Sequence, residues 1–362
     1  MRLTFPRMGN SHIPFKALFA SLGAEVVVPP PSTRRTAALG SRHAPEFACF
    51  PLKMTLGNFI EAAELGADTA VMAGGVGPCR FGYYAQVQKV ILQDLGRDLD
   101  LVVLEPPKLG WIHLAHQVSR LTGGRGAGAL LRAVRLAWAK CNAVDEIERL
   151  ARTSRPRQGE RGAVTRAENA ALDLLDRAES ARQVQEALEA GRSLIARTVA
   201  RRTAEMRVGI VGEIFMVLDG FSNMDLERRL GEMGVEVHRF LTMSGWVRAN
   251  LLPKRYTPAE EREAVGLARP YLDHFVGGHG LESVGGARLY AREGLDGVIQ
   301  VMPFTCMPEI VAESVLRTVS GDTGVPILTL SFDEHTAEAG LQTRLEAFVD
   351  LLRRRRRGAA GG

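Results

Sequence analysis

Short apolar runs alternate with helix-like stretches along this 362-residue chain, and this alternation constrains its fold more than any other feature. A first series contains the runs RLTFP, EVVVP, TAVMA and LVVLE, and a second contains MRVGIVGEI, VEVHRF, DGVIQVM and PILTLSF. Strands that alternate with helices form parallel sheets, because each crossover helix returns the chain to the same end of the sheet. The sequence therefore predicts an α/β fold with two Rossmann-like or flavodoxin-like parallel-sheet domains.

The segment between the two series has a different composition. It is rich in Ala, Arg, Leu and Glu and contains no strand-like run. We therefore expect a first α/β domain over residues 1–111, a helical insert over residues 112–206 and a second α/β domain over residues 207–352.

Two apolar stripes predict the helices of the insert, because residues at alternating spacings of four and three share one helical face. The first stripe consists of Leu130, Val134, Ala137, Cys141 and Val144. The run SRPRQGERG should end that helix, and a second stripe consists of Ala178, Ala181, Val184, Leu188 and Ile195. The pattern predicts two packed antiparallel helices, with Cys141 in the apolar stripe.

The charge of the chain is concentrated at one end. Lys and Arg number 46 against 41 Asp and Glu, and the run Arg353–Arg357 accounts for the whole excess. Nucleic-acid binding needs a concentrated basic face, so we expect no nucleic-acid partner for the folded body. We expect residues 353–362 to form a disordered Arg-rich tail, with a nonspecific acidic or nucleic-acid partner as the alternative.

No apolar window approaches the 18 residues of a membrane span, and Pro6, Pro14 and Lys16 interrupt the region where a signal peptide would be apolar. We therefore expect a cytoplasmic protein that does not associate with membranes. The four cysteines are too few and too widely spaced for a disulfide-stapled fold. In a reducing compartment they are thiols or metal ligands.

Three cysteines share one kind of place in the sequence. Cys49, Cys79 and Cys306 each lie at a strand-to-helix turn or its equivalent, the edge of a parallel sheet where ligands bind. A helix N-terminus also stabilises a thiolate. Their spacing matches neither a zinc ribbon nor a ferredoxin. The residues alone therefore leave two readings open, three convergent metal ligands or unrelated buried thiols.

Six segments resemble a branch of the 2-hydroxyacyl-CoA dehydratase superfamily that is labelled CoA protein activase or acyl-CoA dehydratase activase-related protein. They are FPRMGNSHIPFKALFASLGAEVVVPP, PEFACFPLKMTLGNFIEAAELGAD, GGVGPCRFGYY, VGEIF, PFTCMPEIVAES and DEHTAEAGLQTRLEAFVDLL. The resemblance covers most of both α/β regions, is most specific around the three cysteines and is weak through the helical insert.

The resemblance implies a [4Fe-4S] cluster held by Cys49, Cys79 and Cys306 in a cleft between two domains, with one iron lacking a cysteine ligand. That iron would bind solvent or a substrate oxygen as a Lewis acid, and the cluster would supply single electrons. Cys141 has no place in the family motif and is expected to be a core thiol, although a fourth-ligand role stays open. The chain resembles the cluster-bearing component and not the ATP-hydrolysing activator.

The resemblance also implies partners. In related dehydratases a separate ATP-dependent activator delivers an electron, so that a hydroxyacyl thioester can lose water. We therefore expect a partner subunit, such an activator, and an acyl-CoA or other small-molecule substrate. The function it implies is low-potential electron transfer, or reductive or dehydration chemistry by an iron–sulfur lyase or reductase component.

Several polar residues lie near these cysteines or at other strand ends. Lys53, Arg80 and Glu309 are within four residues of a cysteine and either adjust the charge around a cluster or form surface ion pairs. Glu334 and His335, which follow Asp333 after the run PILTLSF, are candidate catalytic residues, with a helix cap as the alternative. Three further residues could line the cleft: Asn10, Glu213 and His279.

Two other functions compete with the leading one. The chain could be a non-catalytic cluster carrier or electron-relay subunit whose open iron is covered by a partner protein. It could also be a redox-inert α/β module that binds a small molecule and whose thiols are structural. Metal content separates the redox-inert module from the leading function and from the cluster carrier.

Overall fold

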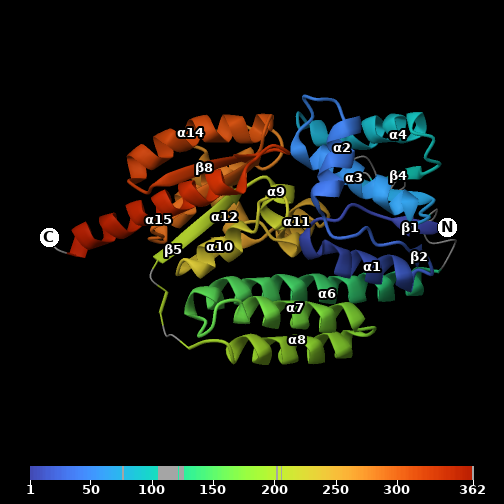
Figure 1. Ribbon diagram of the computed structural model, residues 1–362, viewed down its shortest axis with the longest axis horizontal. Helices are drawn as coiled ribbons and strands as arrows, with labels where there is room; N and C mark the ends of the chain where they lie inside the picture. Colours follow the sequence, from blue (N-terminus) through green and yellow to red (C-terminus); the bar gives the residue numbers. More distant parts are fainter. Residues whose placement is uncertain (76, 105–120, 122–125, 201–202, 205, 361–362) are drawn as a thin grey trace.

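The strand pattern of the sequence is reproduced in the computed structural model, which describes residues 1–75, 77–104, 121, 126–200, 203–204 and 206–360 (Figure 1). Eight strands form two separate four-stranded sheets, and every strand pair in them is parallel. The predicted α/β class with two parallel-sheet domains is therefore confirmed. The predicted boundary at residues 111 and 112 lies outside the described residues.

The first sheet has the strand order β2-β1-β3-β4. Its strands are β1 (Arg2–Thr4), β2 (Glu25–Val26), β3 (Thr69–Ala73) and β4 (Asp100–Leu104). The described helices of this domain are α1 (His12–Ser21), α2 (Arg34–His43), α3 (Phe50–Glu64) and α4 (Tyr84–Asp94). Four of the five residues of β3 are buried, as expected for a parallel strand covered on both faces.

The second sheet repeats this order as β6-β5-β7-β8. Its strands are β5 (Met206–Gly212), β6 (Val235–Arg239), β7 (Gly297–Pro303) and β8 (Ile327–Phe332). Its helices are α9 (Ile214–Leu218), α10 (Leu226–Glu232), α11 (Met243–Asn250), α12 (Ala259–Ala268), α13 (Gly280–Arg292), α14 (Met307–Thr323) and α15 (Glu338–Ala360). In both sheets the direction of winding reverses between the first and third strands, which is the flavodoxin-like arrangement, and ligands bind beyond that point.

The arginine run at the end of the chain is helical, so the predicted disordered tail is wrong as far as Ala360. Helix α15 continues through Arg353–Arg357. Its apolar residues Leu345 and Leu352 are buried against the second sheet, and Arg355 Nη2 donates to Gly324 O at 2.7 Å. Since Arg is a good helix former, it extends a helix that packing has already fixed.

The insert contains three described helices where the stripes predicted two. They are α6 (Ala127–Ser154), α7 (Ala163–Arg177) and α8 (Ala181–Ala196), with a short 3-10 turn, η4 (Arg155–Arg157), after α6. The second stripe is divided because Ala178 ends α7, and the Ser180 side chain then caps α8 by accepting from Gln183 N. The first predicted stripe includes Val134, which is 46% exposed and therefore not part of the buried face. Cys141 and Val144 of the same stripe are buried as expected.

Helix α6 lies under both α/β domains (Figure 1). On the side of the first domain, Asn10 Nδ2 donates to Glu148 Oε1 at 2.8 Å. On the side of the second, Arg239 pairs with the other oxygen of Glu148, and Ser244 N donates to Asp145 Oδ2 at 2.8 Å. One helix of the insert therefore connects the two domains.

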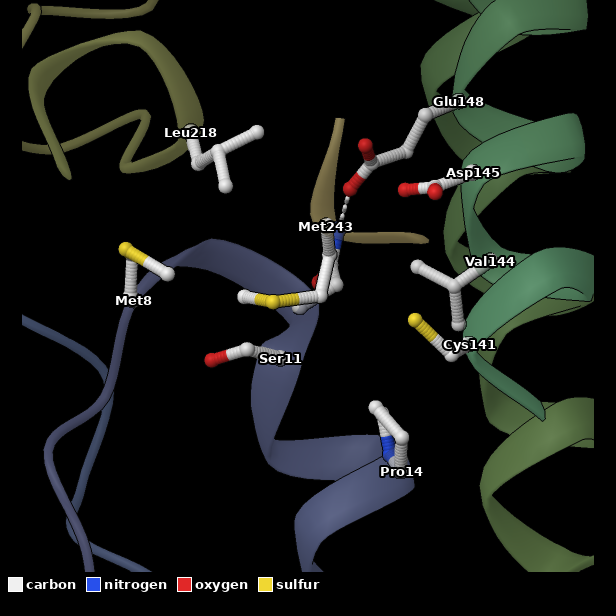
Figure 2. A pocket seen from close by; sticks show the side chains of 10 residues that line it. Met8, Ser11, Pro14, Cys141, Val144, Asp145, Glu148, Leu218 and Met243 are labelled. Carbon is white, nitrogen blue, oxygen red and sulfur yellow. Dashed lines mark hydrogen bonds between the residues drawn. The ribbon is translucent and has the colours of Figure 1, made fainter. Parts of the chain in front are cut away.

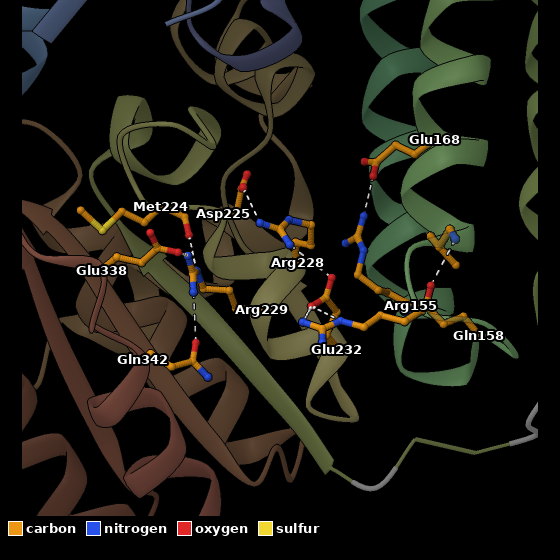
Figure 3. Close-up of polar contacts among 12 residues, drawn as sticks. Arg155, Gln158, Glu168, Met224, Asp225, Arg228, Arg229, Glu232, Glu338 and Gln342 are labelled. Carbon is orange, nitrogen blue, oxygen red and sulfur yellow. Dashed lines mark hydrogen bonds and ion pairs between the residues drawn. The ribbon is translucent and has the colours of Figure 1, made fainter. Parts of the chain in front are cut away.

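Side-chain pairs also connect α10 to its neighbours (Figure 3). Arg229 Nε donates to Met224 O at 2.8 Å, and Arg229 Nη1 donates to Gln342 Oε1 of α15 at 3.1 Å. Within the insert, Arg155 pairs with Glu168 of α7. None of the described helices is long and apolar enough to cross a membrane.

Candidate functional site

The three predicted cysteines all lie at helix starts. Cys49 is the N-cap of α3, Cys306 is the N-cap of α14, and Cys79 is the N-cap of the 3-10 helix η2 (Arg80–Tyr83). Cys79 and Cys306 follow β3 and β7, the third strands of their sheets, whereas Cys49 lies in the turn between α2 and α3 and not directly after a strand. Each sulfur is thus next to the free N–H groups of a helix start.

One carbonyl oxygen ties the three cysteine segments together. Phe47 O accepts a hydrogen bond from Arg80 Nη1 at 3.0 Å and another from Thr305 Oγ1 at 3.2 Å. These donors are the neighbours of Cys79 and Cys306, and Phe47 lies two residues before Cys49. The site is therefore assembled from both α/β domains, and the Arg80 side chain bonds to the backbone where a surface ion pair was the alternative.

The glycine-rich turn before α13 closes another side of the site. Gly277 has a φ of +93°, and a Cβ there would lie 2.9 Å from Cys79 N. Gly278 has a φ of +48°, and a Cβ there would lie 3.2 Å from Cγ of Pro308. Only glycine suits these positions, because both need a left-handed backbone and close approach. The turn that contains His279 thus packs against the segments of Cys79 and Cys306.

Burial is the main influence on all three thiols. It raises the pKa of Cys49 to about 11, against the opposing effect of a hydrogen bond from Tyr84, and it raises the pKa values of Cys79 and Cys306 as well. Glu213 raises all three further through its negative charge. The three thiols therefore share one electrostatic environment, which includes Glu213.

Two carboxyl groups border these thiols. Glu213 follows β5 and accepts from Phe215 N and Met216 N at 3.1 and 3.0 Å, and burial raises its pKa to about 7. Glu309 is fully buried one turn into α14, and burial likewise raises its pKa to about 7. Both groups therefore exchange protons near neutral pH beside the sulfurs.

The Glu309 carboxylate is part of a buried polar network. Ser283 Oγ donates to it at 2.9 Å, and Gln300 Nε2 donates to it at 2.8 Å. Sequence analysis placed Glu309 near a cysteine, and the structure places its side chain between α13 and β7. Ser283 and Gln300 were missed, because only the packing of α13 and α14 on the sheet brings them to Glu309.

Lys53 and Glu334 form a part-buried ion pair between the two domains. Lys53 Nζ lies 2.5 Å from Glu334 Oε1 and also donates to Glu46 O at 3.2 Å. The Lys53 side chain is 6% exposed, so this is not the surface pair that was the alternative. Both residues were predicted near the site, and the structure joins them one turn after Cys49.

The side chain or backbone of two other predicted polar positions, His335 and Asn10, bonds away from the cysteines. His335 is exposed, and its N–H donates to Asp333 Oδ1 at 3.0 Å. Thr336 Oγ1 donates to the same oxygen at 2.8 Å, so Asp333 closes the turn that precedes α15. Asn10 was expected to face the cleft, but its side chain bonds to Glu148 of α6.

Tyr84 is a site residue that sequence analysis missed. Its hydroxyl oxygen lies 2.5 Å from Cys49 Sγ, and the residue is 4% exposed. Tyr84 starts α4, five residues after Cys79, and reaches Cys49 only because α4 packs on α3. The signal in the sequence was the pair of tyrosines in GGVGPCRFGYY, of which Tyr83 is exposed.

Cys141 lies elsewhere. Its thiol, on α6, points into a small pocket between α6 and α1 that is also lined by Ser11, Pro14 and Met243 (Figure 2). The cavity has a volume of about 10 Å³, which is room for about one water molecule. Since no cluster fits there, the surroundings of Cys141 suit a core thiol and not a fourth ligand.

Exposed apolar residues lie on or near the cysteine segments, and we call them together the apolar rim. Seven exposed apolar residues on these segments, on α14 and before α13 form it: Phe47, Tyr83, Phe275, Phe304, Met307, Ile310 and Val311. Phe47, Tyr83 and Phe304 are 70, 73 and 61% exposed. Exposed apolar patches of this kind mark interaction sites on soluble proteins.

Among the described residues, no three His, Cys, Asp or Glu side chains are grouped closely enough to hold a single metal ion. A four-iron cluster is larger than one ion, so its ligand sulfurs stand farther apart than the ligands of an ion. Neither a protein-family model nor a curated protein matches this chain.

Proposed function

We propose that Cys49, Cys79 and Cys306 bind a [4Fe-4S] cluster and that the protein performs low-potential electron transfer, or reductive or dehydration chemistry, as its resemblance to the 2-hydroxyacyl-CoA dehydratase superfamily implies. The observation that carries the proposal is that three N-cap cysteines from two domains lie on segments joined by hydrogen bonds to Phe47 O. Thiolates are the standard protein ligands of such clusters.

The residues present fit this group in three respects. The donors are thiols, and each lies at a helix start, where partial positive charge stabilises a thiolate. Cys49 and Cys306 are 8 and 7% exposed, which limits access of water and oxygen to their sulfurs. The raised pKa values mean that the free thiols hold protons at pH 7, so metal binding would release them.

A bound cluster of this type supplies single electrons and, at an iron without a protein ligand, a Lewis acid. The chain supplies the proton-transfer groups: Glu213 and Glu309, with pKa values of about 7, can each hold or release a proton beside the sulfurs. Lys53 holds Glu334 in the pair that joins the domains next to Cys49. We assign Glu213 and Glu309 to proton exchange and the Lys53–Glu334 pair to positioning.

The apolar rim supports a protein partner as part of the same proposal. Exposed Phe, Tyr, Met, Ile and Val side chains are typical of a docking site, and those of the apolar rim lie on or near the three cysteine segments. We therefore assign this face to the partner subunit or the separate ATP-dependent activator. The substrate in this proposal is an acyl-CoA or another small molecule, and a reducing cytoplasm is the expected location.

Iron and acid-labile sulfide analysis of protein purified without oxygen tests the proposal, together with EPR after dithionite reduction. We expect about four iron and four sulfide per chain, and loss of most of both in Cys49→Ser, Cys79→Ser and Cys306→Ser. Cys141→Ser is the matched control and should keep the cluster. Equal iron content in all four variants, or zinc in place of iron, would contradict the assignment.

The exposed rim also favours the second candidate, an electron-relay subunit whose substrate is another protein. Reduced, cluster-loaded protein that dehydrates or reduces a hydroxyacyl-CoA without any partner would exclude a pure relay. Electron transfer to an added partner protein with no turnover of the small molecule would favour it.

A further inference from the structure

The hydroxyl of Tyr84 is committed to one sulfur. It lies 2.5 Å from Cys49 Sγ, and within the described part of the chain this is the hydroxyl's one hydrogen bond. The phenol is 4% exposed, so water does not compete for it.

Packing holds the ring in this place. Tyr84 meets Phe81 edge to face with centroids 5.2 Å apart. One helical turn later, Gln88 Nε2 donates to Thr55 Oγ1 at 2.6 Å and to Leu52 O at 3.3 Å, which fixes α4 on α3. Because residues four apart share a helix face, the contact of Gln88 also fixes the position of Tyr84. The hydroxyl is therefore pre-oriented toward the start of α3.

We propose that Tyr84 is a positioning and tuning residue of the iron–sulfur site, which donates a hydrogen bond to the sulfur of Cys49 and thereby raises the reduction potential of the cluster. A metal-bound sulfur has no proton to donate, so the phenol must be the donor in the loaded protein. The reduced cluster carries one more negative charge than the oxidised one. A donor aimed at a ligand sulfur therefore stabilises the reduced state. This inference rests on the proposed function.

The structure offers a matched pair of variants, because the neighbouring Tyr83 is 73% exposed. Tyr84→Phe removes only the hydroxyl, and Tyr83→Phe makes the same chemical change outside the core. We expect an EPR-monitored redox titration to give a more negative midpoint potential for Tyr84→Phe. At a given potential, the ratio of reduced to oxidised protein should fall about tenfold, which corresponds to a shift of about 59 mV for one electron. Tyr83→Phe should match the wild type.

A second measurement keeps the test decisive if Tyr84→Phe folds poorly. Incorporation of 3,5-difluorotyrosine at position 84 keeps the ring and makes the hydroxyl a stronger donor, so the midpoint should move in the opposite direction. Proton ENDOR of the reduced protein should show a signal that disappears in D₂O and that is missing in Tyr84→Phe. Both signatures distinguish hydrogen bonding from a merely structural role of the ring.

The outcomes separate the inference from the proposed function. Wild-type protein with four iron and four sulfide, but with one midpoint for wild type, Tyr84→Phe and the fluorinated protein, would overturn the role of Tyr84 and leave the cluster assignment standing. Wild-type protein without iron and sulfide would overturn both.

Discussion

Burial changes the acid–base behaviour of several glutamates in this protein, and Glu168 is the clearest case away from the cysteines. It pairs with Arg155 between η4 and α7, yet burial outweighs that pair and raises the pKa of Glu168 to about 7. The usual value is 4.5, so between about pH 4.5 and 7 the folded state binds more protons than the unfolded state. The contribution of Glu168 to folding stability then falls as pH rises through this range.

We expect Glu168→Gln to reduce that loss. The glutamine needs no proton to enter the folded state, so the decrease in the free energy of unfolding between pH 5 and 7 should become smaller by about 1 to 3 kcal/mol. Urea unfolding at a series of pH values measures it. Glu186→Gln, at an exposed residue of α8 that pairs with Arg182, is the control and should keep the wild-type slope. An unchanged slope in Glu168→Gln would show that this carboxylate is ionised throughout.

The contact of Tyr84 with Cys49 is an example of a site contact that could not be predicted from the sequence. The position of Cys49, Cys79 and Cys306 at helix starts could be predicted, because apolar runs, prolines and helix-like segments mark those turns along the chain. Tyr84 reaches Cys49 only through the packing of α4 on α3, and Ser283 reaches Glu309 only through the packing of α13 and α14. Such contacts depend on tertiary geometry and leave no local spacing to detect.

At the scale of elements, the crossing of α2 and α3 determines where Cys49 stands. A Cβ at Gly40 would lie 1.7 Å from Lys53 O, and one at Gly57 would lie 2.1 Å from Thr36 O. The two backbones touch at both points, so neither helix can accept a side chain there. The first turn of α3, with Cys49 at its cap, is positioned by this contact.

Overpacking usually costs about 1 to 3 kcal/mol. Gly40→Ala should destabilise the protein by more than this, because the added carbon would meet backbone atoms of α3 and not a side chain that can move aside. Thermal unfolding measures the effect, and iron content of the variant should fall as the start of α3 moves. Gly321→Ala in α14 is the matched control, since no atom lies within 4 Å of the added carbon. It should be neutral or stabilising by up to about 1 kcal/mol. Equal stability of the two variants would contradict the close crossing.

The elements themselves were largely predictable. All eight strands coincide with apolar runs, because buried parallel strands need continuous apolar sequence. The arginine run was assigned wrongly because its composition is that of a solvated tail. Only the packing of Leu345 and Leu352 shows that a helix is already established before it. The division of α7 from α8 depended on the Ser180 cap, which a periodic pattern does not record.

For the whole molecule, the contacts of α6 decide how the domains are arranged. Glu148 bonds to Asn10 of the first domain and Arg239 of the second, and Arg239 has a side chain that is 3% exposed. The pKa of Glu148 is lowered despite the opposing effect of burial, since Arg239 and Arg152 stabilise its negative charge. A single carboxylate thus neutralises buried charge at the junction of three bodies.

Glu148→Ala should cost about 3 to 5 kcal/mol, because it leaves the Arg239 guanidinium buried without its main partner. Hydrogen exchange should quicken in α1 and β6, the elements that flank the junction. Glu148→Gln keeps a bond to Asn10, so its stability should lie between that of the wild type and that of Glu148→Ala. Glu186→Ala, on exposed α8, should have little effect on stability. Unaltered exchange in α1 and β6 would mean that the domains hold each other without α6.

Helix α6 lies below the two α/β domains in Figure 1, and α3 and α14, which begin at Cys49 and Cys306, lie above it. The helix is continuous over 28 residues and touches both domains, so it can serve as a fulcrum for them. Movement of the second domain away from the first would separate Cys306 from Cys49 and Cys79, and it would break the Lys53–Glu334 pair and the Thr305 bond to Phe47 O, which cross between the domains. A cluster bound by the three sulfurs as proposed would therefore also hold the two domains at one separation.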